Sequence, residues 1–161
     1  MTRIEEYSAK YNSQVIDLIL DIQRNEFQVP ITREDQPDLV QVEKFYRQGN
    51  GNFWVAVNDG RVVGSIALLD IGNGEGALRK MFVHRDHRGL SRTGQALLDT
   101  LFVWARDKGF RDIYLGTTEM FKAAQRFYEK NGFIEVPADS LPARFPVMKV
   151  DVKFYRYCLC R

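Results

Sequence analysis

The chain has 161 residues, of which 45% are hydrophobic and 27% are charged, with a formal net charge of +2. This length and composition are typical of a soluble globular protein, and we expect one domain over residues 1–161. The small net charge argues against a nucleic-acid partner. No apolar run approaches the ~20 residues of a membrane helix, and the first residues lack the apolar segment of a signal peptide. We therefore expect a cytoplasmic location and no membrane partner.

Four segments show the apolar spacing of amphipathic helices. The expected helices cover residues 11–27, 37–48, 94–108 and, from a cap at Thr117 or Thr118, the stretch up to Asn131. Pro37 near the start and Gly49 past the end of the second helix match the usual positions of these residues. Gly109 and Gly132 mark the ends of the third and fourth helices.

Seven segments are expected to form strands. They are residues 3–7, 53–57, 62–69, 76–83, 113–115, 133–136 and 147–159. Asp59–Gly60 predicts a tight hairpin between the second and third strands, and Gly72–Gly76 reads as a flexible connection. The helix at 94–108 lies between two strands, which implies that these pair in parallel or lie near one another. The last strand is expected to run antiparallel to its predecessor.

A basic, glycine-containing turn joins the strand at 76–83 to the helix at 94–108. It carries Arg85, Arg88 and Arg92 together with Gly89. Free backbone N–H groups and the positive end of the helix dipole would meet at such a turn, and both favour a phosphate. The alternative is an ordinary exposed connection with solvated arginines, and the turn alone leaves both interpretations open.

The remaining residues that could ligate a metal are few. Cys158 and Cys160 alternate along the expected last strand and so point to opposite faces, which disfavours a disulfide or a shared ligand. We interpret them as strand residues in a reducing compartment. His84 and His87 flank the basic turn without a cysteine or carboxylate cluster nearby and are interpreted as polar loop residues. No metal is expected.

Two motifs occupy the second half of the chain. The first is Met81-Phe82-Val83, the turn from Arg88 to Gly94, and Ala96-Leu97-Leu98. The second runs from Ala124 to Phe133 and reads AQRFYEKNGF. In type, order and spacing they resemble the GCN5-related N-acetyltransferase (GNAT) superfamily over about residues 53–136. Two positions depart from its pattern, because Arg92 stands where the middle glycine of the turn is usual and Phe121 where an asparagine is usual.

The resemblance implies an α+β fold in which about four helices flank a mixed, mostly antiparallel sheet of about seven strands. It implies acetyl-CoA as co-substrate and a primary amine as acceptor, with direct attack in a ternary complex. The strand carrying Met81–Val83 would splay from that carrying Ile113–Leu115, with the pantetheine arm in the gap and an N–H near Val83 available to the thioester oxygen. The cofactor-binding residues that it implies are Met81, Phe82, Val83, Arg88, Gly89, Leu90, Ser91, Arg92, Thr93, Gly94 and Ala124.

Tyr128 stands where the family places the acid that protonates the leaving thiolate; the alternative is a core aromatic. The proton acceptor for the attacking amine stays unassigned among the surface carboxylates Glu26, Asp70, Glu75 and Glu119. The acceptor pocket is expected between the first two helices and the proline-bearing loop at 137–146. Its expected walls include Phe27, Phe45 and Phe145.

The acceptor itself is not defined by the sequence, and small molecules, protein N-termini and lysines all stay open. A homodimer is one option for the assembly. The alternative function is a non-catalytic module that senses acyl-CoA, which the departures at Arg92 and Phe121 keep under consideration.

Overall fold

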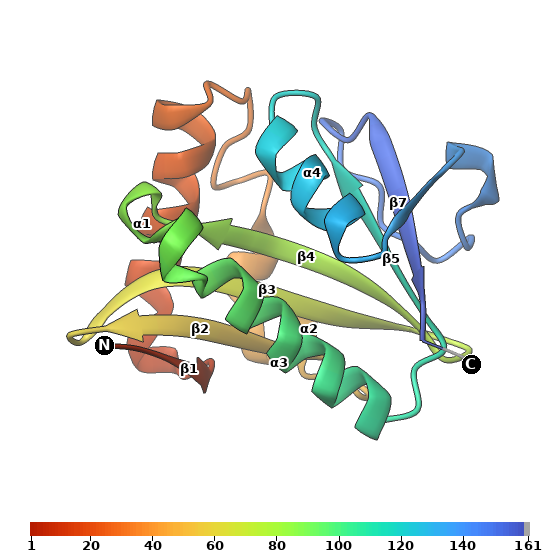
Figure 1. The fold of residues 1–161 in the computed structure, drawn as a ribbon, viewed down its shortest axis with the longest axis horizontal. Helices are drawn as coiled ribbons and strands as arrows, with labels where there is room; N and C mark the ends of the chain where they lie inside the picture. The colour runs from red at the N-terminus through yellow and green to blue at the C-terminus, as the bar shows by residue number, and fades with distance from the viewer. Residues whose placement is uncertain (160–161) are drawn as a thin grey trace.

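The computed structural model describes residues 1–159, and a single seven-stranded sheet runs through it in the order β1-β2-β3-β4-β5-β7-β6 (Figure 1). The strands are β1 (Thr2–Glu6), β2 (Asn52–Asn58), β3 (Arg61–Gly72), β4 (Glu75–Val83), β5 (Asp112–Thr117), β6 (Ile134–Val136) and β7 (Lys153–Cys158). β4 and β5 are parallel, and every other neighbouring pair is antiparallel. The mixed, mostly antiparallel sheet and the orientation of the last strand confirm the sequence predictions.

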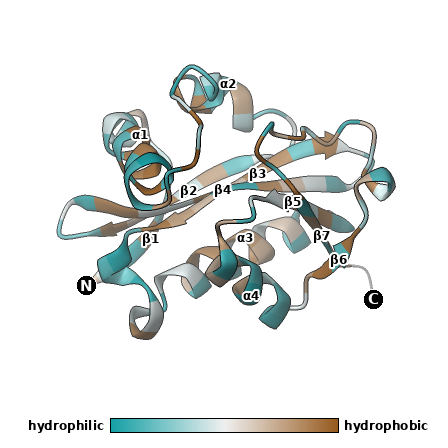
Figure 2. Ribbon diagram, turned by 90° about the horizontal axis from the view of Figure 1, so that it is seen from above, coloured by the Kyte–Doolittle hydropathy of each residue, from teal (hydrophilic) through white to brown (hydrophobic). Residues whose placement is uncertain are grey.

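Two layers of helices cover the sheet. They are α1 (Asn12–Leu20), α2 (Val42–Tyr46), α3 (Thr93–Asp107) and α4 (Lys122–Lys130). α1 and α2 lie on one face, and α3 and α4 lie on the other (Figure 2). The predicted α+β fold with four helices is thereby confirmed. Within the described residues, none of the helices has the length and apolar character needed to cross a membrane.

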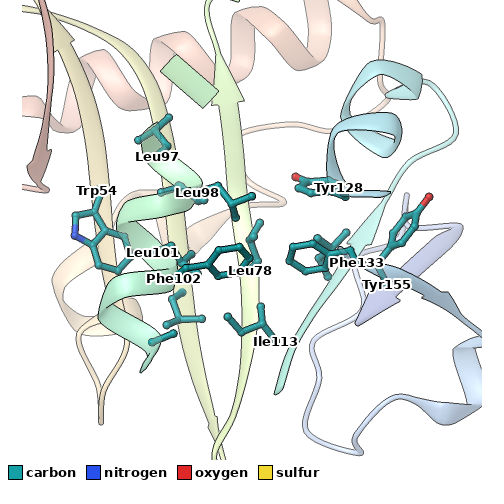
Figure 3. Close-up of a cluster of buried hydrophobic side chains, with 14 of the residues drawn as sticks. Trp54, Leu78, Leu97, Leu98, Leu101, Phe102, Ile113, Tyr128, Phe133 and Tyr155 are labelled. Atoms are coloured by element: carbon teal, nitrogen blue, oxygen red, sulfur yellow. The ribbon is translucent and has the colours of Figure 1, made fainter. Parts of the chain in front are cut away.

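Two large buried apolar cores lie on the two faces of the sheet, and a smaller buried cluster includes Phe145 and Phe154. Leu97, Leu98 and Leu101 of α3 form one with the sheet, and Tyr128 of α4 packs into the same core (Figure 3). The other core lies beneath α1 and α2, where Ile19 and Tyr46 are fully buried. The sheet therefore separates the molecule into an α1–α2 side and an α3–α4 side.

The hairpin between β2 and β3 forms as predicted. Asp59 and Gly60 both have positive φ, 52° and 77°. Two central residues of this kind give the tight turn whose twist matches that of the flanking strands.

The first two helices differ from their predicted form. The helix expected over 11–27 is α-helical only to Leu20 and then continues as a π-helical stretch, Asp21–Glu26. Residues 12–26 together are called the first helical segment. The single helix expected over 37–48 is wrong, because the chain forms a 3-10 turn, Pro37–Leu39, followed by the short α2. Asp38 in that turn is buried and accepts a hydrogen bond from the hydroxyl of Tyr46 in α2. The spacing of apolar residues along the chain does not show that a carboxylate turns inward, so it could not predict this break in the helix.

Two predicted boundaries in the second half were also wrong. α4 begins at Lys122 rather than near Thr118, since Phe121 caps it and packs its ring against Phe27, which follows the first helical segment, with ring centres 5.0 Å apart. The last strand begins at Lys153 rather than at residue 147, because residues 148–151 form a turn closed by a hydrogen bond from the N–H of Asp151 to the carbonyl of Met148. Cys158 ends that strand, and the prediction for Cys160 lies outside the described residues.

Candidate active site between the splayed strands

The parallel strands β4 and β5 pair over only three residues. Glu75–Ala77 pairs with Asp112–Tyr114, and beyond that point the strands diverge as a V in Figure 1. A cavity of about 490 Å³ occupies the divergence. Both strands, the basic turn, α4, the first helical segment and residues 145–151 contribute to its walls. The splay that the resemblance implied is therefore present.

β4 contains a bulge at the edge of this cavity. Ile66 of β3 faces two residues of β4, since Ser65 pairs with Phe82 and Ala67 with Arg79. Lys80, inside the bulge, has a φ of 56°, which is rare for a residue with a side chain. The extra residue lets successive side chains reach the same face. Arg79 and Lys80 both extend to the α1–α2 side, where Arg79 lies over the ring of Tyr46 and Lys80 beside Asp38.

The residues predicted to bind the cofactor are brought together in part. Eight of them line the cavity: Met81, Phe82, Val83, Arg88, Gly89, Arg92, Gly94 and Ala124. Leu90, Ser91 and Thr93 do not line it. The side chain of Leu90 is fully exposed, that of Ser91 bonds to the carbonyl of His87, and that of Thr93 is buried at the start of α3. The cofactor-binding role of the whole set stays a prediction.

The basic turn reaches α3 through two short 3-10 turns, Arg85–His87 and Gly89–Ser91. Arg92 precedes α3 in a left-handed conformation with a φ of 57°. Gly94, in the first turn of α3, lines the cavity. The positive end of a 15-residue helix thus adjoins the cavity mouth, an arrangement that favours an anion.

The two arginines predicted to meet a phosphate are placed differently. Arg88 donates from both terminal nitrogens to the carboxylate of Glu26, at 2.5 and 2.8 Å, and from Nε to the carbonyl of Val83 at 2.8 Å. The pKa of Glu26 is lowered by this hydrogen-bonded pair. Arg92 is exposed and has no ion pair among the described residues. Arg88 therefore ties the turn to the first helical segment, and the phosphate contacts stay predictions.

Tyr128 is both a core aromatic and a residue of the cavity wall. Its side chain is 5% exposed and packs on the rings of Phe127 and Phe133. Figure 3 shows its hydroxyl at the end of the ring nearer β4. No other described residue hydrogen-bonds that hydroxyl, and burial raises its pKa above the ordinary value. A protonated phenol facing a cavity can act as an acid.

None of the four carboxylates considered from the sequence lines the cavity. Glu26 is paired with Arg88, and Asp70 accepts hydrogen bonds from the N–H groups of Asn50 and Gly72. Glu75 lies at the far end of β4, and Glu119 is exposed.

Asp151 is the acidic side chain that does line the cavity. Its carboxylate accepts the N–H of Met148 at 2.9 Å, and burial raises its pKa. It lies against Gly116 of β5, where an added Cβ would stand 2.6 Å from Oδ2. Asp151 is not among the residues expected from the sequence, because no local pattern in residues 148–151 indicates that they fold back onto β5.

A second group missed from the sequence surrounds the ammonium of Lys80. This nitrogen donates to the side-chain carbonyl of Gln36 at 2.6 Å and lies 3.6 Å from Asp38 Oδ2. Gln36 also exchanges amide hydrogen bonds with Gln23, and Tyr46 donates to Asp38. Burial lowers the pKa of Lys80 to about 8. The four partners come from residues 23–46, far from Lys80 in the sequence, so no local motif could predict this group.

The expected acceptor walls are found in part. Phe27 and Phe145 line the cavity, whereas Phe45 does not and instead lies under the guanidinium of Arg79, 5.7 Å from its ring centre. His84 and His87 stay in the turn, as interpreted from the sequence, and the N–H of Asp86 donates to His84 Nδ1 at 3.1 Å. Within residues 1–159, no three His, Cys, Asp or Glu side chains gather as a metal site.

Comparison with known proteins places the chain among acetyltransferases. The family model described as "Acetyltransferase (GNAT) family" matches residues 16–133. A probable N-acetyltransferase camello of Xenopus tropicalis is 34% identical over 137 residues, which cover 83% of this chain and 62% of that protein. The chain thus spans less than two thirds of the length of this relative.

Solved structures extend the likeness to the whole fold. A GNAT-family acetyltransferase of Staphylococcus aureus Mu50 superposes with a TM-score of 0.97 at 41% identity, covering 99% of this chain and 100% of that one. The PaiA N-acetyltransferase of Thermoplasma acidophilum, solved in complex with coenzyme A, superposes with a TM-score of 0.77 at 16% identity over 98% and 99% of the two chains. The second likeness shows the fold alone.

Proposed function

The chain belongs to the GNAT family of acetyltransferases, and from this premise we propose that it transfers the acetyl group of acetyl-CoA to a primary amine by direct attack in a ternary complex. One observation carries the proposal. The cavity between β4 and β5 is lined by the motif residues around Gly94 and Ala124 and also by residues from the α1–α2 side of the sheet. A donor and an acceptor could therefore meet between the strands from opposite faces.

The residues present fit acetyl-CoA. The basic turn and the start of α3 supply a positive mouth for its phosphates, and the diverging strands leave backbone groups of β4 beyond Ala77 unpaired with β5. Ala124 and Phe127 add an apolar wall from α4. The structure of PaiA with coenzyme A, which has the same fold, supports this assignment.

Acetyl-CoA supplies a thioester: the amine nitrogen bonds to the acetyl carbon, the carbon–sulfur bond breaks, and the thiolate takes a proton. Tyr128 is the residue to give that proton, because its phenol is protonated, buried and on the cavity wall. Asp151 is the carboxylate to receive the proton that the ammonium loses. A carboxylate of raised pKa suits this role better than an exposed one.

The finer parts of the proposal stay predictions. They are the cytoplasmic location, the homodimer and the identity of the amine. The non-catalytic sensor shares the same cavity and differs only in that acetyl-CoA would bind without turnover.

An assay of CoA release tests the proposal against the sensor. Purified protein is incubated with acetyl-CoA and a panel of primary amines, and free thiol and acetylated products are measured together. We expect thiol release that depends on the amine and equals the acetylated product. Stabilisation of the fold by acetyl-CoA without any amine-dependent release would instead identify the sensor.

A further inference from the structure

The acceptor side of the cavity has charges that the transfer of acetyl to a simple amine does not require. Four charged side chains gather there around the bulge of β4. They are Arg79 and Lys80 on the bulge, Asp38 behind Lys80, and Asp151 against β5. Their formal charges sum to zero, but the charges are not all paired with one another.

The two cations of the bulge are in different states. The charge of Lys80 is balanced inside the protein, because Asp38 lies 3.6 Å from its ammonium and the side chain of Gln36 accepts a hydrogen bond from it. Arg79 has no ion pair among the described residues. Its guanidinium lies over the rings of Phe45 and Tyr46 and contacts Met148 Sδ at 3.0 Å. Aromatic faces hold the group in place and leave its planar fork available for a carboxylate.

Asp151 is the matching anion. No cation lies within ion-pair distance of it in residues 1–159, and it accepts a single backbone N–H, that of Met148. Burial raises its pKa, and the positive charges of Arg79 and Lys80, beyond ion-pair distance, offset this only in part. A cation in direct contact would therefore stabilise the carboxylate further. Arg79 contacts the sulfur of Met148 and Asp151 accepts the N–H of the same residue, so the two charged groups lie on either side of Met148 without forming an ion pair.

A ligand for this pair needs a carboxylate and an ammonium on one small body. Apolar side chains complete this side of the cavity: Ile22, Val29, Ile31, Phe145 and Val150. On the basis of the proposed function, we propose that the acceptor is an amino acid with an apolar side chain. Arg79 binds its carboxylate and Asp151 binds its ammonium before receiving the proton. The lack of net charge around the bulge is complementary to such a zwitterion.

Matched acids and carboxamides test this inference. The probes are L-leucine, L-methionine and L-phenylalanine, the carboxamide of each, and benzylamine. A carboxamide is the less basic amine and is more fully deprotonated at neutral pH, so a preference for the acid cannot come from amine reactivity. We expect the wild-type protein to use at least one acid with a kcat/KM about 10²-fold above that of its carboxamide, because the carboxamide leaves Arg79 unpaired.

Three variants separate the roles. Arg79→Gln is expected to lower kcat/KM for the acid by about 10²-fold and so to remove most of the preference over the carboxamide. Asp151→Asn should lower kcat/KM for acid and carboxamide alike and keep the preference. Arg61→Gln, which changes an exposed arginine outside the cavity, is the matched control and should change neither. Melting temperatures measured beside the rates distinguish a binding defect from unfolding.

Two results would overturn the inference while the proposed function stood. One is acetylation of benzylamine or of the carboxamides with none of the acids used, and the other is an acid preference that survives Arg79→Gln in a folded protein. Absence of acetyl-CoA binding, or of any amine-dependent thiol release from the whole panel, would instead contradict the proposed function.

Discussion

The two sides of the cavity are lined by different kinds of side chain. On the α3–α4 side the walls are aromatic and aliphatic, with Tyr128 as the buried polar group and a helix start beside the mouth. On the α1–α2 side a buried ion pair, Lys80 with Asp38, stands beside the unpaired Arg79 and Asp151. The first side suits a long ligand held by backbone and apolar contact. The second suits a small charged ligand, and its charges make it the more fragile part of the structure.

The largest effect should come from the buried ion pair. Lys80→Met removes the cation and leaves the carboxylate of Asp38, which is 3% exposed, with only the hydroxyl of Tyr46 to offset its charge. Breaking a buried pair in this way costs about 3–5 kcal/mol in the free energy of unfolding. Urea unfolding measures the loss, and the double variant Lys80→Met with Asp38→Asn should recover part of it.

Lys44→Met is the control for that experiment, since Lys44 is exposed on α2. It should change the free energy of unfolding by less than about 0.5 kcal/mol. If Lys80→Met is as stable as the wild type, the buried pair of Lys80 and Asp38 does not contribute to the free energy of unfolding as proposed.

The next effect concerns chemistry on the α3–α4 side. Tyr128→Phe keeps the ring and removes the hydroxyl, so the fold and the affinity for acetyl-CoA should survive. Single-turnover acetyl transfer should slow by about 10²-fold, the usual scale for loss of a positioned acid. Single-turnover rates are specified because slow release of CoA could hide the effect in steady state.

Tyr155→Phe provides a comparison within the same core. Its hydroxyl donates to Glu129 at 2.7 Å and does not line the cavity. This variant should transfer acetyl at the wild-type rate. Equal rates for all three proteins would leave Tyr128 as a core aromatic only.

A third effect is the pH dependence that Lys80 gives to stability. Its pKa is about 8 in the folded protein against 10.5 ordinarily, so between these values the unfolded chain binds a proton that the folded one does not. The free energy of unfolding should therefore rise with pH above 8, by roughly 1 to 2 kcal/mol at about pH 9.5. Denaturant titrations across this range should show the rise in the wild type and not in Lys80→Met. Stability that falls over the same range in both proteins would contradict it.

The smallest effect is expected at Arg92. Its left-handed conformation, with a φ of 57°, is one that glycine adopts without strain. Arg92→Gly should raise the free energy of unfolding by up to about 1 kcal/mol. The salt dependence of acetyl-CoA affinity should weaken if the arginine meets a phosphate. Arg85→Gly, in a 3-10 turn with ordinary φ, should instead destabilise the protein. If both variants lose stability, the strain at Arg92 is not relieved by glycine.

The sequence could predict the features that depend on local patterns, but not those that depend on contacts between distant segments. The first six strands, the hairpin at Asp59–Gly60 and the motif residues Gly94 and Ala124 depend on local patterns, and their positions agree with the structure to within a few residues. Lys80 and Asp151 depend on the bulge of β4 and on a turn that packs against Gly116, which are contacts between distant segments. The broken second helix has the same origin, because Asp38 turns inward to meet a residue 42 positions away.

Hydrogen exchange of the backbone amides tests most directly whether acetyl-CoA lies between the splayed strands. Exchange is measured on the whole protein with and without saturating acetyl-CoA. We expect slower exchange at 81–83 of β4, at 115–117 of β5 and the following Thr118, and in the turn from Gly89 to Gly94, with β1 unchanged at the far edge of the sheet. Protection elsewhere, with residues 81–83 and 115–118 exchanging as in the free protein, would show that acetyl-CoA does not bind between β4 and β5.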